Sequence, residues 1–190
     1  MAMKINIAVA GGPCTGKSTL AAMLFARLKV LGLDFDLISE EKRKLQREFG
    51  DFRSPWERFY MWLQQEREEL RSTAAHGFIT DFPLFHFYLQ ARRYVKEPRD
   101  RLAVRELFRM CVDREDRYQL IVIAKNPDEI PYKKDGARGS EEKDARERHQ
   151  QVRAFLEHFW PEKLLLVEGG VDERVAQVLQ KLEEMKAAAR

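Results

Sequence analysis

Cysteine is scarce in this chain, and several features that mark particular protein classes are missing. Only two cysteines, Cys14 and Cys111, occur among 190 residues, and they lie far apart. Two separated cysteines support neither a disulfide framework nor a usual zinc site, so we expect a reducing compartment such as the cytoplasm. No internal repeat and no low-complexity tract is visible in the sequence.

Long hydrophobic runs are also missing. No apolar stretch is long enough to span a bilayer, and residues 1–4 lead directly into an expected strand without the pattern of a secretory signal. We therefore expect a cytoplasmic protein with no membrane partner. The net charge is only +3, which is a weak indication of polyanionic partners and leaves a nucleic-acid partner open.

The residues that are present are typical of one globular α/β domain. The chain is 44% hydrophobic and 34% charged, and 190 residues suffice for a five-stranded core with an inserted lid. Short apolar runs alternate with segments of helix formers, which predicts a doubly wound parallel sheet in a single domain over residues 1–190. The expected strands are residues 5–10, 35–38, 77–81, 118–124 and 164–167.

A glycine-rich loop after the first expected strand gives the clearest functional signal. Residues 11–18 fit the pattern G-x-x-x-x-G-K-[ST] at every fixed position, and helix formers follow directly. Gly11 and Gly16 permit backbone conformations in which successive N–H groups point inward around a phosphate. This arrangement predicts a P-loop NTPase fold of three layers.

The P-loop assigns expected roles to its residues. Lys17 should reach the β- and γ-phosphates of ATP, and the hydroxyl group of Ser18 should bind Mg²⁺. The helix that starts near Lys17 adds unpaired N–H groups and the positive end of its dipole. The predicted cofactor-binding residues of this loop are Gly11, Gly12, Pro13, Cys14, Thr15, Gly16, Lys17, Ser18 and Thr19.

Acidic residues stand at the ends of the second and third expected strands. Ligands of open parallel sheets bind beyond the carboxyl ends of the strands, which makes Glu40 and Asp81 candidates for function. Asp81 can hold Mg²⁺ through water or accept the substrate proton, whereas the alternative is a carboxylate that caps the following helix. For Glu40 the alternative is a solvated first turn of a helix.

Aromatic residues gather in the helix expected after residue 55. Trp56, Phe59, Tyr60 and Trp62 can stack on a nucleobase, but aromatic residues at helical spacing are more often part of the core. We therefore favour a core role for these residues.

Arginines supply candidates for binding the acceptor and closing the site. Arg92 and Arg93 are candidates for contact with an acceptor phosphate or a nucleic-acid backbone, although mixed charge is usually a solvated face. A basic loop with glycines and the charged helix after it suit a lid over about residues 131–150, which would exclude water from the transferred phosphoryl group. Arg138 and Arg146 are the candidate lid residues, and an ordinary exposed loop and helix are the alternative.

With these parts in place, the whole chain resembles the P-loop nucleoside and nucleotide kinase-like proteins related to the ribosylnicotinamide kinase domain, which are AAA-type ATP-binding proteins. Beyond the P-loop, the resemblance rests on E-x-x-R at residues 40–43, an acid at Asp81, and D-G-x-R at residues 135–138 followed by Arg146. It implies that Glu40 and Asp81 face the acceptor and the metal.

The resemblance also implies roles for residues outside the P-loop. Arg43 would help to hold the acceptor, Arg138 and Arg146 would form the lid, and the Gly169-Gly170 turn would lie near the adenine. The D-R pair seen in many nucleotide kinases is missing after Asp81, which leaves the proton acceptor open between Asp81 and Glu40.

These observations predict a kinase that uses ATP and Mg²⁺ to phosphorylate a nucleoside, a nucleotide or a related small molecule. One alternative keeps the chemistry but places the acceptor hydroxyl on a nucleic acid, such as a hydroxymethylated base or a strand end. The second alternative is a P-loop ATPase or interaction module that transfers phosphate only to water.

Overall fold

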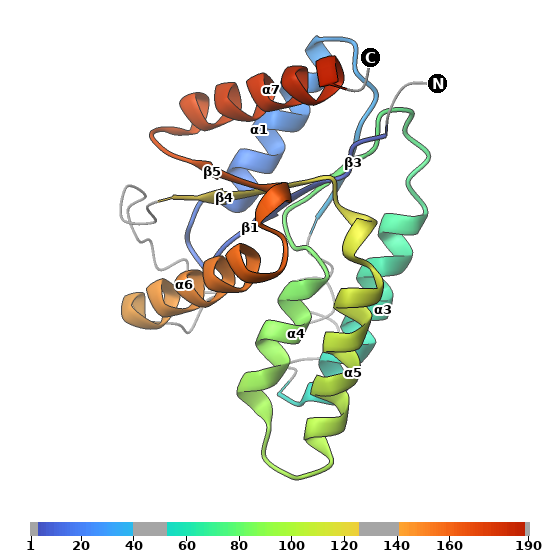
Figure 1. The fold of residues 1–190 in the computed structure, drawn as a ribbon, viewed down its shortest axis with the longest axis vertical. Coiled ribbons are helices and arrows are strands. Elements are labelled where there is room, and N and C mark those ends of the chain that lie inside the picture. The colour runs from blue at the N-terminus through green and yellow to red at the C-terminus, as the bar shows by residue number, and fades with distance from the viewer. Residues whose placement is uncertain (1–3, 40–52, 126–140, 189–190) are drawn as a thin grey trace.

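Five strands alternate with helices along the chain (Figure 1). The computed structural model describes residues 4–39, 53–125 and 141–188. The strands are β1 (Ile7–Ala10), β2 (Asp36–Ile38), β3 (Phe78–Thr80), β4 (Leu120–Ala124) and β5 (Leu164–Val167). The helices are α1 (Lys17–Val30), α3 (Pro55–Leu70), α4 (Phe85–Ala91), α5 (Asp100–Asp113), α6 (Glu142–Phe159) and α7 (Val171–Ala188), with short 3-10 turns at η1 (Arg92–Tyr94), η2 (Glu115–Arg117) and η4 (Pro161–Lys163).

The strands form one parallel sheet in the order β2-β3-β1-β4-β5. The central strand β1 pairs with β3 on one side, where Ala8 faces Thr80, and with β4 on the other, where Ala10 faces Ile123. All five residues of β4 are buried, as expected for a strand covered on both faces. The predicted five-stranded parallel sheet is therefore confirmed.

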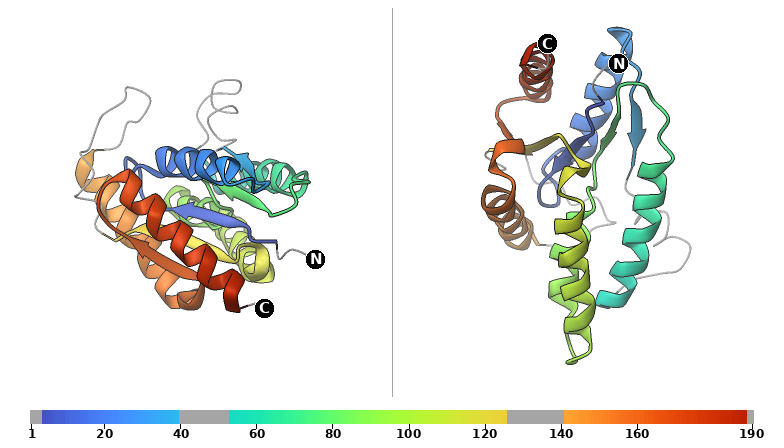
Figure 2. Two further views of the ribbon diagram at one scale, coloured as in Figure 1. Left: turned by 90° about the horizontal axis from the view of Figure 1, so that it is seen from above. Right: turned by 45° about the vertical axis from the view of Figure 1, so that its right-hand side comes forward.

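Helices cover both faces of the sheet and complete the three layers (Figures 1 and 2). Helices α1 and α7 pack on one face, where Leu24 and Val178 join a core cluster with Val9 of β1. The other four helices pack on the opposite face around a second, aromatic-rich cluster, whose buried members include Trp62 and Phe85. This arrangement confirms the predicted α/β P-loop fold.

Helix α3 has a well-defined start and an unexpected exposed side. The side chain of Ser54 accepts a hydrogen bond from the Glu57 N–H, and the Glu57 carboxylate accepts one from the Ser54 N–H, which forms a capping box. Trp62 is fully buried as predicted, whereas Trp56 and Tyr60 are 47% and 44% exposed. A core role is therefore wrong for these two, because the helix buries the opposite side of its surface.

Within residues 4–39, 53–125 and 141–188, no helix has both the length and the apolar character needed to cross a membrane.

Candidate active site

The P-loop connects the carboxyl end of β1 to the start of α1, in the order the sequence predicted. Gly11 has φ 132° and Gly16 has φ 71°, both in the region that favours glycine. Cys14 also has a positive φ, of 59°, so a residue at a free position of the motif shares the left-handed conformation. These angles turn the chain sharply between the strand and the helix.

The side chain of Lys17 folds back onto its own loop. Its Nζ donates a hydrogen bond to the carbonyl oxygen of Gly12 at 2.6 Å, and the Thr15 hydroxyl donates to the same oxygen at 2.9 Å. Ser18 and Thr19 stand in the first turn of α1 with exposed side chains. Lys17 thus contacts the loop itself through Gly12, whereas Ser18 lies at the exposed start of α1.

Two histidines that the sequence did not assign to the site contact the glycine pair. His149 of α6 accepts a hydrogen bond from the Gly12 N–H through Nδ1 at 3.3 Å, and His86 of α4 accepts a longer one from the Gly11 N–H through Nε2 at 3.5 Å. His86 is buried, and its ring packs against those of Phe82 and Phe85. Two different helices therefore fix the first half of the loop.

His149 is a buried, neutral imidazole. It is 1% exposed, and Nε2 lies 2.9 Å from the carbonyl oxygen of Ala124, so Nε2 carries the proton while Nδ1 accepts from Gly12. Burial lowers the pKa of His149 to about 4, and the nearby charges of Lys17, Arg153 and Arg146 act in the same direction.

Asp81 follows β3 directly and lies one strand away from the P-loop strand. It is 8% exposed, and its Oδ1 has no hydrogen-bond partner within the described part of the chain. The preceding Thr80 hydroxyl accepts from Gln65 Nε2 and from the Phe82 N–H, each at 3.3 Å, so the backbone around Asp81 is held on both sides. A buried carboxylate oxygen without a donor is suited to a cation or to a substrate hydroxyl.

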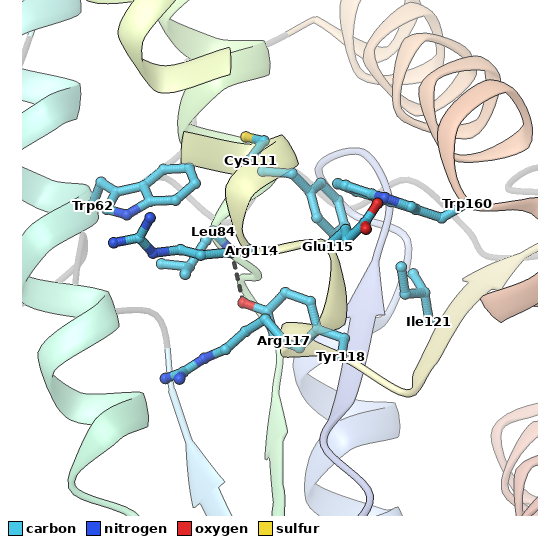
Figure 3. Close-up of a pocket in the computed structure, with 10 residues that line it drawn as sticks. Trp62, Leu84, Cys111, Arg114, Glu115, Arg117, Tyr118, Ile121 and Trp160 are labelled. Carbon is cyan, nitrogen blue, oxygen red and sulfur yellow. Dashed lines mark hydrogen bonds between the residues drawn. The ribbon is translucent and has the colours of Figure 1, made fainter. Parts of the chain in front are cut away.

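A second buried carboxylate lies behind the β3 segment. Glu69 of α3 accepts hydrogen bonds from Tyr118 and Arg117, and burial raises its pKa to about 7. Figure 3 shows the neighbouring pocket, in which the Tyr118 hydroxyl points toward Leu84. Many of the residues that line this pocket come from the end of α5 and the chain that leads into β4, and no P-loop residue is among them. We do not assign the nucleotide to it.

The predicted arginines are only partly brought together. Arg93 forms an ion pair with Asp144 of α6 at 2.6 Å, and Arg148 contacts the same carboxylate. Partial burial raises the pKa of Asp144, but the hydrogen bonds from both arginines lower it overall. Arg146 pairs with Glu142 at 3.0 Å within α6, and Arg92 lies over the Tyr88 ring. The η1 turn and the start of α6 therefore meet through Asp144.

Some of the remaining predicted site residues lie in the described part of the chain, and others do not. The Gly169-Gly170 turn follows β5 at the same edge as the P-loop, and its Gly170 N–H donates to the Glu173 carboxylate at 2.6 Å. The Glu40, Arg43 and Arg138 positions lie outside the described residues, as does the part of the expected lid region before residue 141.

A magnesium ion fits the donor set on chemical grounds. Mg²⁺ binds few protein oxygens and is completed by phosphates and water, which matches one hydroxyl from Ser18 and one carboxylate from Asp81. The described residues hold no cluster of three or more histidine, cysteine, aspartate or glutamate side chains that would form a metal cage of protein ligands alone.

Comparison with known proteins places this geometry among P-loop proteins. A family model described as AAA domain matches residues 6–174. The structure of NadR protein in complex with NAD and AMP-PNP superposes with a TM-score of 0.73 at 20% sequence identity, over 97% of this chain and 50% of NadR. The complex of NadR with NR gives 0.70 at 21% identity, over 94% of this chain and 51% of NadR.

A kinase that is shorter than NadR has the same fold as this chain. Deoxyadenosine kinase from M. mycoides, solved with dCMP and dCDP, gives a TM-score of 0.64 at 13% identity, over 95% of this chain and 100% of its own. The chain thus spans about half the length of NadR and the full length of this kinase. No curated protein sequence matches the chain.

Proposed function

Because the chain belongs to the family described as AAA domain, a family of P-loop proteins, we propose that it is a kinase that uses ATP and Mg²⁺. Residues 1–190 would form one P-loop kinase domain. It would transfer the γ-phosphoryl group to a nucleoside, a nucleotide or a related small molecule.

The observation that carries this proposal is the placement of two groups at one edge of the sheet. The P-loop follows β1 and Asp81 follows β3, and these strands are neighbours in the parallel sheet. A phosphate-binding loop beside a buried carboxylate with an unsatisfied oxygen supplies what phosphoryl transfer needs, a donor site and a group that orients the acceptor.

The transfer can be written with the residues present. Lys17 would leave the Gly12 carbonyl to contact the β- and γ-phosphates, where its charge stabilises the transition state. Ser18 and Asp81 would hold Mg²⁺, which when bound neutralises charge on the phosphate oxygens. The acceptor oxygen forms a bond to the γ-phosphorus, the bond from that phosphorus to the β,γ-bridging oxygen breaks, and ADP leaves. Asp81 or Glu40 would take the acceptor proton.

Other residues would complete the two substrate sites. We propose that Arg92, Arg93 and Arg43 bind the acceptor, and that Arg146 and Arg138 contact the transferred group from the lid side. Gly169 and Gly170 would lie beside the adenine, since their turn follows β5 at the same sheet edge as the P-loop. The structural neighbours that hold NR, dCMP and dCDP support an acceptor of nucleoside or nucleotide type.

A survey of acceptors with γ-labelled ATP tests the proposal. The full chain is incubated with Mg²⁺ and with nucleosides, nucleotides or DNA and RNA oligonucleotides, and the labelled product is identified. We expect label in a nucleoside or nucleotide. Label in polymer would move the acceptor to nucleic acid, and free phosphate alone would leave an ATPase.

Lys17→Ala is the matched variant for this survey. The Lys17 ammonium group donates to the Gly12 carbonyl oxygen within its own loop, and the residue is partly exposed, so we expect the fold to survive its removal. Transfer should fall by a factor on the order of 10³ or more, because the variant lacks the positive charge that would stabilise the moving phosphoryl group. Full activity in a folded Lys17→Ala protein would refute the assignment.

A further inference from the structure

Gly12 occupies a free position of the P-loop motif, yet the packing of α6 requires glycine there. A Cβ atom at Gly12 would lie 2.5 Å from the Ala145 carbonyl oxygen and 2.8 Å from the His149 backbone nitrogen. Both are backbone atoms of α6, so they cannot rotate away as a side chain can. The absence of a side chain at Gly12 therefore lets α6 rest directly on the loop.

His149 fastens α6 to this contact from two sides. Its Nδ1 accepts from the Gly12 N–H at 3.3 Å, and its Nε2–H donates to the Ala124 carbonyl at the end of β4, 2.9 Å away. β4 is the neighbour of β1 in the sheet. The hydrogen bond from Nε2 to the end of β4 thus orients the ring, and Nδ1 holds the phosphate-binding loop.

The glycine that His149 holds is also the glycine that receives Lys17. The Gly12 carbonyl accepts from Lys17 Nζ and from the Thr15 hydroxyl, while its N–H is engaged by His149. Both polar groups of Gly12 are therefore occupied by partners within the fold. When Lys17 leaves for the phosphates, the Thr15 hydroxyl and His149 still hold the two polar groups of Gly12, so the loop keeps its course.

We propose that His149 is a positioning residue for the phosphate-binding loop, acting through its Nδ1 acceptor on the Gly12 N–H. This inference rests on the proposed function, because its consequence is measured in nucleotide binding. His149 does not contact the reacting atoms in this role. It sets the distance between the loop and α6, the helix that also carries Arg146 one turn before it.

Two substitutions test the Nδ1 acceptor of His149 separately from its Nε2 donor. In His149→Asn, the amide oxygen can take the place of Nδ1 and still accept from Gly12, but the contact with Ala124 is lost. In His149→Gln, the longer amide reaches the place of Nε2 and can still donate to Ala124, but no acceptor faces Gly12. Each variant keeps one of the two hydrogen bonds, and both leave space where the ring was.

Equilibrium binding of ATP with Mg²⁺ to the full chain is the first measurement. We expect His149→Gln to weaken binding by roughly fivefold or more and His149→Asn to change it by less than about twofold, because only the former leaves the buried Gly12 N–H unsatisfied. Urea unfolding of both variants is measured alongside. A residue with a purely structural role would lower the stability of both variants and leave the affinity of the folded protein unchanged.

Amide exchange and ring nitrogen shifts, measured by NMR without nucleotide, provide a second and independent measurement. We expect the Gly12 amide to exchange faster in His149→Gln than in the wild type or His149→Asn, and Nδ1 of the wild-type ring to be unprotonated. Equal affinities in the two variants, equal Gly12 exchange, or a protonated Nδ1 would each overturn the proposal. If the wild type binds no ATP, the proposed function fails while the NMR result still decides the role of His149.

Discussion

The hydroxyl group of Tyr118 joins Glu69 of α3 to the chain that follows β3. It donates to Glu69 Oε1 at 2.8 Å and accepts from the Leu84 N–H at 2.9 Å. Arg117 Nε donates to the other carboxylate oxygen at 2.9 Å, and Glu69 is 2% exposed. Tyr118 therefore links the segment between Asp81 and α4 to the buried carboxylate of Glu69.

Glu69→Gln should change how stability depends on pH. Burial raises the pKa of Glu69 from 4.5 to about 7, so the folded protein binds more protons than the unfolded chain between these values. Stability from this group is present below pH 4.5 and is lost as pH rises to 7, by an amount on the order of 3 kcal/mol.

The measurement is urea unfolding of both proteins from pH 4.5 to 8. We expect the wild type to lose stability relative to Glu69→Gln as pH rises, because glutamine keeps an acceptor for Tyr118 and does not ionise. A wild type that gains on the variant over this range would show that Arg117 lowers the pKa of Glu69 more than burial raises it.

Asp81→Asn should separate function from stability. The substitution keeps the shape of the side chain and removes the charge from a carboxylate whose Oδ1 has no partner within the described residues. We expect phosphoryl transfer to fall by about 10²-fold or more, the range of one general base. The melting temperature without nucleotide should stay equal or rise, since a buried charge is removed.

Thermal unfolding and transfer assays on the same Asp81→Asn preparation check this expectation. If Asp81 only capped the following helix, the variant would melt lower while the folded fraction kept its activity.

Gly12→Ala should be far more harmful than Gly170→Ala. A Cβ atom at Gly12 meets the Ala145 carbonyl at 2.5 Å, whereas one at Gly170 meets only the Glu173 carboxylate at 3.5 Å, an ordinary contact. We expect Gly12→Ala to cost about 1–3 kcal/mol as α6 is pushed from the loop, and Gly170→Ala to cost little. Urea unfolding of the two variants measures the difference, and equal values would mean that α6 adapts without strain.

The layer structure could be predicted because each of its signals is local. The strand over residues 164–167 has the expected bounds, and the P-loop lies between β1 and α1 as the motif requires. The position of Asp81 beside the P-loop strand follows from β3 pairing with β1. Short apolar runs and glycine spacing are sufficient to predict these features.

The histidines at the site could not be predicted in this way. The hydrogen bond from Gly12 to His149 joins residues 137 positions apart, and the one from Gly11 to His86 joins residues 75 apart. A histidine in a charged helix such as α6, or in an aromatic-rich helix such as α4, carries no periodic signal that distinguishes a buried acceptor from a surface residue. The one available hint was a second glycine at Gly12, where the motif accepts any residue. The exposure of Trp56 and Tyr60 was missed for the same reason, because it depends on how α3 meets its neighbours.

His149→Asn should reveal a pH dependence that the wild type conceals. Burial lowers the pKa of His149 from 6.5 to about 4, so the unfolded chain binds more protons than the folded protein between these values. Stability from this group therefore falls as pH decreases from 6.5 to 4, by an amount on the order of 3 kcal/mol. Glu69 has the opposite effect over nearly the same range.

In the wild type the two effects oppose each other between pH 4.5 and 6.5, which gives a flatter stability profile than either group alone would. His149→Asn removes the contribution of His149, so the stability of this variant should decrease as pH rises through this range. The stability of Glu69→Gln, which keeps His149, should increase over the same interval. The double variant should regain the flatter profile, because His149 and Glu69 act on separate parts of the core and their terms add. Urea unfolding at half-unit pH steps follows all four proteins. Parallel profiles for the two single variants would show that neither buried group titrates in the fold as its surroundings require.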